Sequence, residues 1–279
     1  MNKNFIRIIP FLDIKNGLLI KGINLDGFRI MGEPSLFSDF YNKSGADEIC
    51  YIDAVASLFG TLNLTNFIKK CSKKIFVPLN IGGGINSVDK INKMLGSGAD
   101  KIVINTAAVE DPFFIKEASR IFGSSTITVQ IQTIKINNKY YITKSSGRDI
   151  EKITPKDFAK KMQDCGAGEI IITSINHEGL KKGFDLKIID EISSKLQIPC
   201  IAHGGAGCFE DVYNVINKTN ITGVGIASLF HYEAIHFFKK INTRIGNINY
   251  LKSVKRKKKI NIIKELKYFL KRKKINIRL

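Results

Sequence analysis

The stretches VPLNIGGG at residues 77–84 and IPCIAHGG at residues 198–205 are two copies of one pattern, 121 residues apart. Each copy has a proline before a short apolar run and ends in consecutive glycines. Each is followed, after a helix-like segment, by a short apolar run that ends in small residues, Asn-Thr-Ala at 105–107 and Ala-Ser at 227–228. A repeat of this kind indicates that the chain consists of two equivalent halves.

Short apolar runs alternate with amphipathic segments along the rest of the chain. Most of the runs are continuous in Val and Ile, as expected for parallel strands that are covered on both faces. We predict strands at residues 7–12, 48–53, 75–81, 101–105, 126–132, 169–174, 199–202 and 223–226, and helices at 87–97, 112–122, 154–165 and 185–195. Eight strands that alternate with helices in about 250 residues are typical of one α/β fold, the (β/α)8 or TIM barrel. The repeat favours two half-barrels over a doubly wound open sheet.

Composition and charge narrow the class of protein. The chain is 44% hydrophobic and 25% charged, which is typical of a globular protein and excludes intrinsic disorder. Of the formal net charge of +19, +12 falls in residues 252–279. We expect a barrel over residues 1–234, a basic insertion over 235–259, and a final barrel helix and tail over 260–279. Basic segments attract nucleic acid, but this one has no interleaved aromatic residues, so we expect no specific nucleic-acid partner.

No stretch reaches the roughly 18 uninterrupted apolar residues of a membrane span, and the first residues lack a signal-peptide pattern. We therefore expect a cytoplasmic protein with no membrane partner. The five cysteines form no CxxC motif and no zinc-ligand cluster with histidine. We expect neither a metal nor a cofactor.

The repeat has a chemical consequence. The active site of such a barrel lies at the carboxyl ends of its strands. Glycines at that position let backbone N–H groups approach an anion, and the following helix adds a partial positive charge. A glycine turn by itself is more often a tight loop, but two in register, each paired with a hydroxyl-bearing strand end, predict two phosphate sites across one mouth. The expected ligand is a small molecule with a phosphate at each end.

A series of motifs follows the predicted strands: IIPFLDIKNG at 8–17, KGIN at 21–24, GADE at 45–48, IGGGI at 81–85, GADK at 98–101, INTAAV at 104–109, GAGE at 166–169, TS at 173–174, GFD at 183–185 and GGAG at 204–207. Together they resemble the cyclase subunit of imidazole glycerol phosphate synthase, from about residue 7 to residue 232 and again near 262–278. The resemblance implies a (β/α)8 barrel of histidine biosynthesis that works as a heterodimer with a glutaminase subunit. Such a cyclase uses ammonia to close an imidazole ring on a ribulosyl bisphosphate-type substrate, which gives imidazole glycerol phosphate and aminoimidazole carboxamide ribotide.

The resemblance also implies roles for individual residues. One phosphate would bind at Gly84, Asn105 and Thr106, and the other at Gly179, Gly205, Ala227 and Ser228. Asp13 matches a catalytic carboxylate, although a salt bridge with Lys21 is the structural alternative for this residue. A gate for ammonia would consist of Arg7, Glu48, Lys101 and Glu169, unless these charges only plug the barrel, and Asp100 would face the glutaminase.

The sequence departs from the family at the mouth. Gln132 stands where the family has its second catalytic Asp. An amide cannot act as a general acid or base, and losing one such group costs about 10²–10⁴ in rate. The family's Ser-x-Asp-x-Asp-Gly-Thr stretch reads SINHEGL at 174–180. His203 replaces a serine, either as a positive or donor group near a phosphate or as a space-filling side chain.

Three hypotheses remain open from the sequence. The first is the ammonia-using cyclase, with activity reduced by Gln132. The second is a paralogue that passes ammonia to a separate enzyme for acetamidino modification of a surface-polysaccharide sugar; Gln132 favours it, while Asp13 favours the first. The third is a non-catalytic phosphate-binding scaffold with a basic tail that binds nucleic acid.

Overall fold

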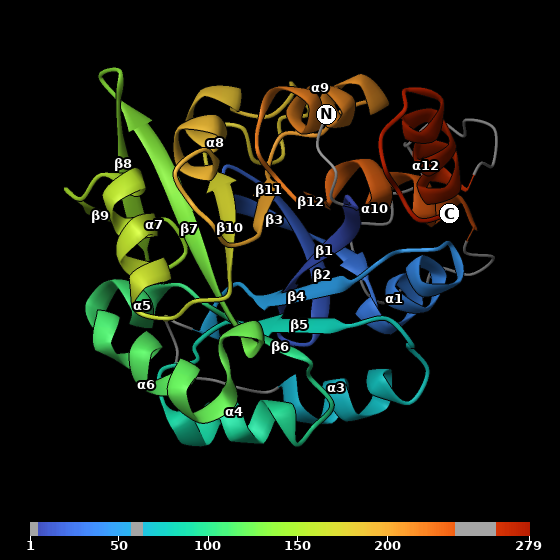
Figure 1. The fold of residues 1–279 in the computed structure, drawn as a ribbon. Helices are drawn as coiled ribbons and strands as arrows, with labels where there is room; N and C mark the ends of the chain where they lie inside the picture. Colours follow the sequence, from blue (N-terminus) through green and yellow to red (C-terminus); the bar gives the residue numbers. More distant parts are fainter. Residues whose placement is uncertain (1–4, 57–63, 238–260) are drawn as a thin grey trace.

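Eight parallel strands form a closed barrel at the centre of the molecule (Figure 1). The computed structural model describes residues 5–56, 64–237 and 261–279. The barrel order is β10-β11-β12-β1-β4-β5-β6-β7, and β7 pairs with β10 to close it. The strands are β1 (Arg7–Lys15), β4 (Ile49–Asp53), β5 (Leu79–Gly82), β6 (Lys101–Ile104), β7 (Ile127–Ile136), β10 (Glu169–Ser174), β11 (Cys200–His203) and β12 (Gly223–Ile226). The predicted (β/α)8 barrel is confirmed.

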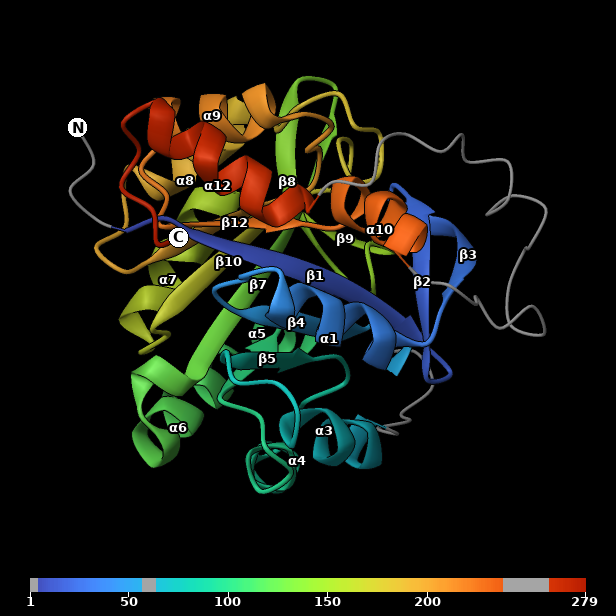
Figure 2. The same ribbon diagram turned by 90° about the vertical axis from the view of Figure 1, so that its right-hand side faces the viewer.

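Helices surround the barrel on its outside (Figure 2). They are α1 (Pro34–Lys43), α3 (Leu64–Ser72), α4 (Val88–Leu95), α5 (Thr106–Glu110), α6 (Pro112–Phe122), α7 (Pro155–Asp164), α8 (Leu186–Ser193), α9 (Phe209–Lys218), α10 (Ser228–Ala234) and α12 (Ile262–Arg272), with 3-10 turns at Ser124–Thr126 and Ile235–Phe237. The four predicted helices, α4, α6, α7 and α8, agree to within two residues at each end. None of the described helices combines the length and the apolar character needed to cross a membrane.

Side-chain caps explain where several helices begin. Ser87 and Thr154 each accept a hydrogen bond from the backbone N–H three residues later, at α4 and α7, and Pro155 occupies the first turn of α7. Of the predicted basic insertion at 235–259, residues 238–259 lie outside the described ranges.

Two antiparallel hairpins extend the barrel strands and were not predicted from the sequence. After β1 come β2 (Leu18–Ile23) and β3 (Asp26–Gly32), and after β7 come β8 (Lys139–Lys144) and β9 (Asp149–Glu151). The β7–β8 turn places two asparagines, at 137 and 138, in the left-handed region, with φ of 47° and 62°. Consecutive left-handed residues make the tight turn that suits a hairpin.

The two halves of the barrel repeat one backbone geometry. Asn105 and Ala227, which precede the short helices α5 and α10, have φ and ψ of −122° and −78° and of −111° and −81°. Gly84 and Gly205 both have positive φ, 66° and 123°. The glycine turns and the strand ends that follow them therefore occupy equivalent places around one mouth.

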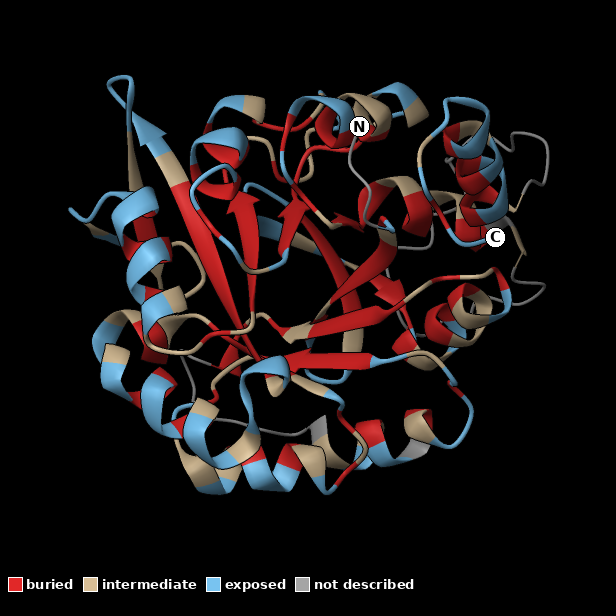
Figure 3. Ribbon diagram, viewed as in Figure 1, coloured by how far each residue is buried: buried red, intermediate tan, exposed pale blue. Residues whose placement is uncertain are grey.

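The barrel strands are buried along most of their length (Figure 3). A large apolar core lies between the strands and the helices, and a second cluster fills the barrel interior: Ile9, Phe11, Cys50, Val103, Ile171, Ile201 and Ala227. Within this interior the Phe11 ring stacks on the His203 ring with a centroid distance of 4.2 Å. Gly225 on β12 makes room for that pair, because a Cβ there would lie 2.5 Å from Phe11 Cε2 and 3.1 Å from His203 Cδ2.

We therefore predict that Gly225→Ala overpacks the interior and lowers the free energy of unfolding by about 1–3 kcal/mol. The double variant Gly225→Ala with Phe11→Leu should recover part of the lost free energy of unfolding, because the smaller side chain makes room for the added methyl group. Gly96→Ala is the matched control, because Gly96 has an ordinary φ of −64° at the end of α4. Urea denaturation measures all three, and a Gly225→Ala variant as stable as the Gly96→Ala variant would contradict this account of the packing.

Candidate active site

Four charged side chains meet in a ring at the amino-terminal base of the barrel. Arg7 donates to Glu48 Oε1 at 2.7 Å through Nη1 and to Glu169 Oε1 at 2.5 Å through Nη2. Lys101 Nζ lies 3.2 Å from Glu48 Oε1 and 3.0 Å from Glu169 Oε2. Each cation therefore contacts both carboxylates. The residues expected to form a gate lie together, on β1, β6 and β10 and directly before β4.

The pairing keeps these groups charged although they are largely buried. Burial on its own lowers the pKa of Arg7, but Glu169 and Glu48 outweigh it and raise the pKa above its ordinary value. Burial likewise raises the pKa of Glu48, but Arg7 and Lys101 outweigh it and hold the pKa below its usual range. Asn80 adds a hydrogen bond from Nδ2 to Glu48 Oε2 at 2.8 Å.

Asp100 also lies at the base, directly before β6. It is exposed, and its Oδ2 accepts a hydrogen bond from the Leu79 N–H at 2.8 Å, which caps the start of β5. This carboxylate therefore lies at the surface around the ring.

Asp13 lies at the opposite, carboxyl-terminal mouth of the barrel, toward the end of β1. Burial raises the pKa of its carboxyl to about 6, with Lys21 opposing the shift and Glu178 adding to it. Lys21 on β2 forms a buried ion pair with Glu178, and the Leu25 N–H donates to Glu178 Oε2 at 3.3 Å. Lys21 thus forms its salt bridge with Glu178 and not with Asp13, which was the alternative considered from the sequence. The carboxyl of Asp13 is left with a pKa of about 6, close to neutral pH.

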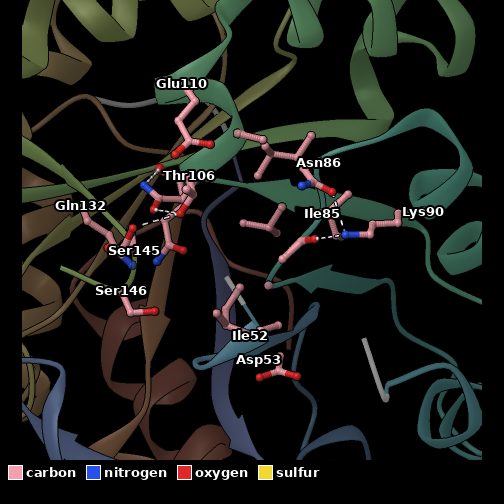
Figure 4. A pocket seen from close by; sticks show the side chains of 18 residues that line it. Ile52, Asp53, Ile85, Asn86, Lys90, Thr106, Glu110, Gln132, Ser145 and Ser146 are labelled. Carbon is pink, nitrogen blue, oxygen red and sulfur yellow. Dashed lines mark hydrogen bonds between the residues drawn. The ribbon is translucent and has the colours of Figure 1, made fainter. Parts of the chain in front are cut away.

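The first glycine turn lines a cavity of about 180 Å³ at the mouth (Figure 4). The lining includes Gly84, Asn105 and Thr106, the three residues expected at one phosphate site. Figure 4 shows Gln132, Thr106 and Ser145 on one side of the cavity and Asn86 and Lys90 on the other.

Lys90 supplies a cation to this cavity that the sequence analysis missed. Its Nζ donates to Gly84 O at 3.1 Å and to Asn86 Oδ1 at 2.7 Å. The sequence could have indicated this role, because Lys90 lies in the first turn of α4, the helix that follows the glycine turn. Thr106 Oγ1 accepts the Ser145 N–H at 3.1 Å, so the β8–β9 turn also borders the cavity. An anion here would meet a lysine, a hydroxyl and backbone N–H groups.

A second, smaller cavity lies around the other glycine turn. Its lining brings together the four residues expected at the second phosphate site, Gly179, Gly205, Ala227 and Ser228, and adds Glu178, Lys181 and His203. Lys181 Nζ lies 3.8 Å from the centroid of the Tyr232 ring. The sequence analysis missed Lys181, which follows Gly179 by two residues.

His203 borders this second cavity as a neutral side chain. Burial and the nearby Lys21 lower its pKa to about 3. Its Nδ1 lies 3.1 Å from Thr173 Oγ1, and its ring stacks on Phe11. The low pKa argues against a positive charge on His203 near a phosphate, and the ring packs against Phe11. A neutral imidazole keeps one N–H, so a donor role near the phosphate stays a prediction.

Gln132 is 7% exposed and lines the first cavity, and its Oε1 has no hydrogen-bond partner among the described residues. The neighbouring Gln130, two residues earlier on β7, donates from Nε2 to Thr173 Oγ1 at 3.0 Å. Of the two positions expected to carry the catalytic carboxylates, one thus holds Asp13 and the other holds an amide, while Asp53, Glu110 and Glu178 also border the cavities.

The fold and the mouth define a (β/α)8 barrel with two glycine-lined cavities at the carboxyl ends of its strands. Residues 7–236 match the histidine biosynthesis protein family, and the chain belongs to that family. Similar proteins are named imidazole glycerol phosphate synthase subunit HisF. The one from Natranaerobius thermophilus is 40% identical over 229 residues, 82% of this chain and 91% of the relative. Those from Legionella pneumophila and Campylobacter concisus are 42% and 40% identical, over 74% and 86% of this chain and 98% and 94% of their own lengths.

We predict that the ring at the base contributes strongly to stability. Glu48→Gln leaves Arg7 and Lys101 with one carboxylate between them and should lower the free energy of unfolding by about 3 kcal/mol. The control is Asp39→Asn, which breaks the exposed pair with Lys43 and should cost less than about 1 kcal/mol. Equal losses for the two variants in urea denaturation would show that the ring is not held as described.

Proposed function

We propose that this chain is the cyclase subunit of an imidazole glycerol phosphate synthase in histidine biosynthesis. It would use ammonia from a glutaminase subunit to form imidazole glycerol phosphate and aminoimidazole carboxamide ribotide. The names of its relatives support the reaction class. The observation that carries the proposal is the carboxyl-terminal end of the barrel, where two glycine-lined cavities lie at the same end as Asp13, whose pKa burial raises to about 6.

The two cavities would receive the two ends of a bisphosphate, although the second, at about 10 Å³, would have to widen to admit a phosphate. In the first, one phosphate would accept hydrogen bonds from Thr106 and from the backbone at Gly84, with Lys90 as counter-charge. In the second, the other phosphate would bind at Gly205 and Ser228, with Lys181 nearby. Holding both ends fixes the reacting centre of the substrate across the mouth.

Asp13 would move protons during ammonia addition and ring closure. A general acid–base group works best when its pKa lies near the operating pH, because both protonation states are then accessible. Burial gives Asp13 that property, and the Lys21–Glu178 pair is the charged neighbour that adjusts it. With Gln132 in place of a second carboxylate, Asp13 would work with water or substrate groups, and we expect a reduced rate.

The ring at the base would be the entrance for ammonia. Arg7, Lys101 and their two carboxylates lie at the end of the barrel opposite the mouth, and a glutaminase docked there would release ammonia onto the axis. Asp100, exposed beside the ring, would face that partner.

Gln132 supports a second candidate function. A barrel that only passes ammonia to a separate sugar-modifying enzyme, for an acetamidino group of a surface polysaccharide, would need little acid–base chemistry of its own. The amide at position 132 is compatible with that role, whereas the carboxylate and pKa of Asp13 favour the cyclase.

The deciding experiment supplies the purified chain with the ribulosyl bisphosphate substrate and ammonium salt and follows the loss of substrate absorbance. We expect slow turnover, with a rate that rises through about pH 6 after correction for the ammonia fraction, because Asp13 must lose its proton to act as a base. Asp13→Asn should abolish turnover, and Gln132→Asp should raise it by about 10²-fold or more. No turnover by the natural chain, with turnover restored by Gln132→Asp, would overturn the cyclase proposal in favour of the ammonia-passing paralogue.

A further inference from the structure

Three buried polar atoms inside the barrel have no hydrogen-bond partner among the described residues. They are Asn80 Oδ1, Thr128 Oγ1 and Gln132 Oε1. Proteins pair nearly all buried polar atoms, so unpaired ones indicate a role beyond packing. The other atoms of this kind belong to Tyr51, Thr65 and His231, which lie on or against the helical layer.

The unpaired atoms of β7 lie on its inward face. Residues two apart on a strand point to the same side, so Thr128, Gln130 and Gln132 share one face. Thr128 is in register with Glu169 of the ring, and Gln132 is in register with Thr173 and lines the mouth cavity. The polar face of β7 therefore runs from the ring at the base to the candidate active site.

Asn80 lies at the base of this arrangement and Gln130 lies at its middle. Asn80 donates to Glu48 through Nδ2, which leaves its Oδ1 as a free acceptor beside the ring. Gln130 donates to Thr173, whose hydroxyl also meets His203, so the middle of the row is held by its own hydrogen bonds. The remaining interior is apolar, with Ile9, Val103 and Ile171 among its members.

A row of acceptors in an apolar interior favours a small neutral hydrogen-bond donor. In the apolar middle of the interior, between the ring at the base and Asp13 at the mouth, an ion would lose its hydration with no opposite charge beside it. Ammonia has three N–H donors and one lone pair, so it can donate to an amide oxygen and keep its lone pair free.

We propose that Gln132 Oε1 is an ammonia-binding group at the head of this row, where it holds the nucleophile by one N–H beside the substrate cavity. This inference rests on the proposed use of ammonia. It gives Gln132 a binding role in place of the proton transfer that the residue cannot perform.

The first test measures binding without turnover. The chain has four glutamines, at 130, 132, 163 and 197, so selective ¹⁵N labelling of glutamine gives four side-chain amide signals. Gln132→Leu identifies the signal of Gln132. Titration with ammonium chloride above neutral pH should shift that signal saturably, while potassium chloride at the same pH and ionic strength should not. Gln163 accepts the Gln197 N–H at 2.7 Å on the outside of the barrel, so these two signals are internal controls.

The second test uses steady-state kinetics. Gln132→Leu should raise the KM for ammonia about tenfold or more, and by a larger factor than the KM for the bisphosphate, because one hydrogen bond to the nucleophile is lost. Thr133→Val is the matched control. Thr133 is also buried on β7, but its hydroxyl donates to Thr173 O on the other face, so this variant should change stability and neither KM.

The outcomes separate this inference from the proposed function. Turnover with no ammonia-specific shift of Gln132, or with an unchanged KM for ammonia in Gln132→Leu, overturns the ammonia site and leaves the cyclase standing. An equal shift with potassium chloride also overturns it. A saturable, ammonia-specific shift in a chain that does not turn over the bisphosphate upholds the site and overturns the cyclase.

Discussion

Arg7 and Lys101 each contact both Glu48 and Glu169, so strands that lie far apart in the sequence are held at one level of the barrel axis. Burying four charges is costly unless every one of them is paired, and here each has two partners. The interior above the ring and the cavities at the mouth both depend on this closure.

The interior combines tight packing with a polar edge. Gly225 lacks a side chain where Phe11 and His203 stack, so these two rings occupy the space that a larger residue on β12 would otherwise fill. The inward face of β7 keeps amides and hydroxyls between the ring and the mouth. The barrel is therefore neither a uniform apolar core nor an aqueous channel, and a small neutral molecule suits it better than an ion.

The sequence predicted the parts of the fold that local patterns determine. Continuous Val and Ile runs identified all eight barrel strands, and the two glycine turns identified both cavities. The hairpins after β1 and β7 were missed because their signal is only two residues at each turn, Asn16-Gly17 and the asparagines at 137 and 138.

Contacts between distant residues could not be predicted in the same way. Lys21 and Glu178 are 157 positions apart, and only the folded register shows that Lys21 pairs with Glu178 and not with Asp13. The neutral state of His203 likewise follows from its burial and from Lys21, neither of which a single sequence displays. The unpaired oxygen of Gln132 is a property of three-dimensional packing, whereas the replacement itself was visible in the sequence.

The central claim is that nitrogen enters at the ring and reacts at the mouth. Its most direct test pairs the chain with a glutaminase subunit and supplies glutamine labelled with ¹⁵N in its side-chain amide, together with excess unlabelled ammonium chloride. Mass spectrometry of the imidazole glycerol phosphate then gives the source of the nitrogen. The account predicts a product that carries the ¹⁵N label despite the excess of free ammonium. A product labelled only in proportion to the mixed pool would contradict entry through the base of the barrel.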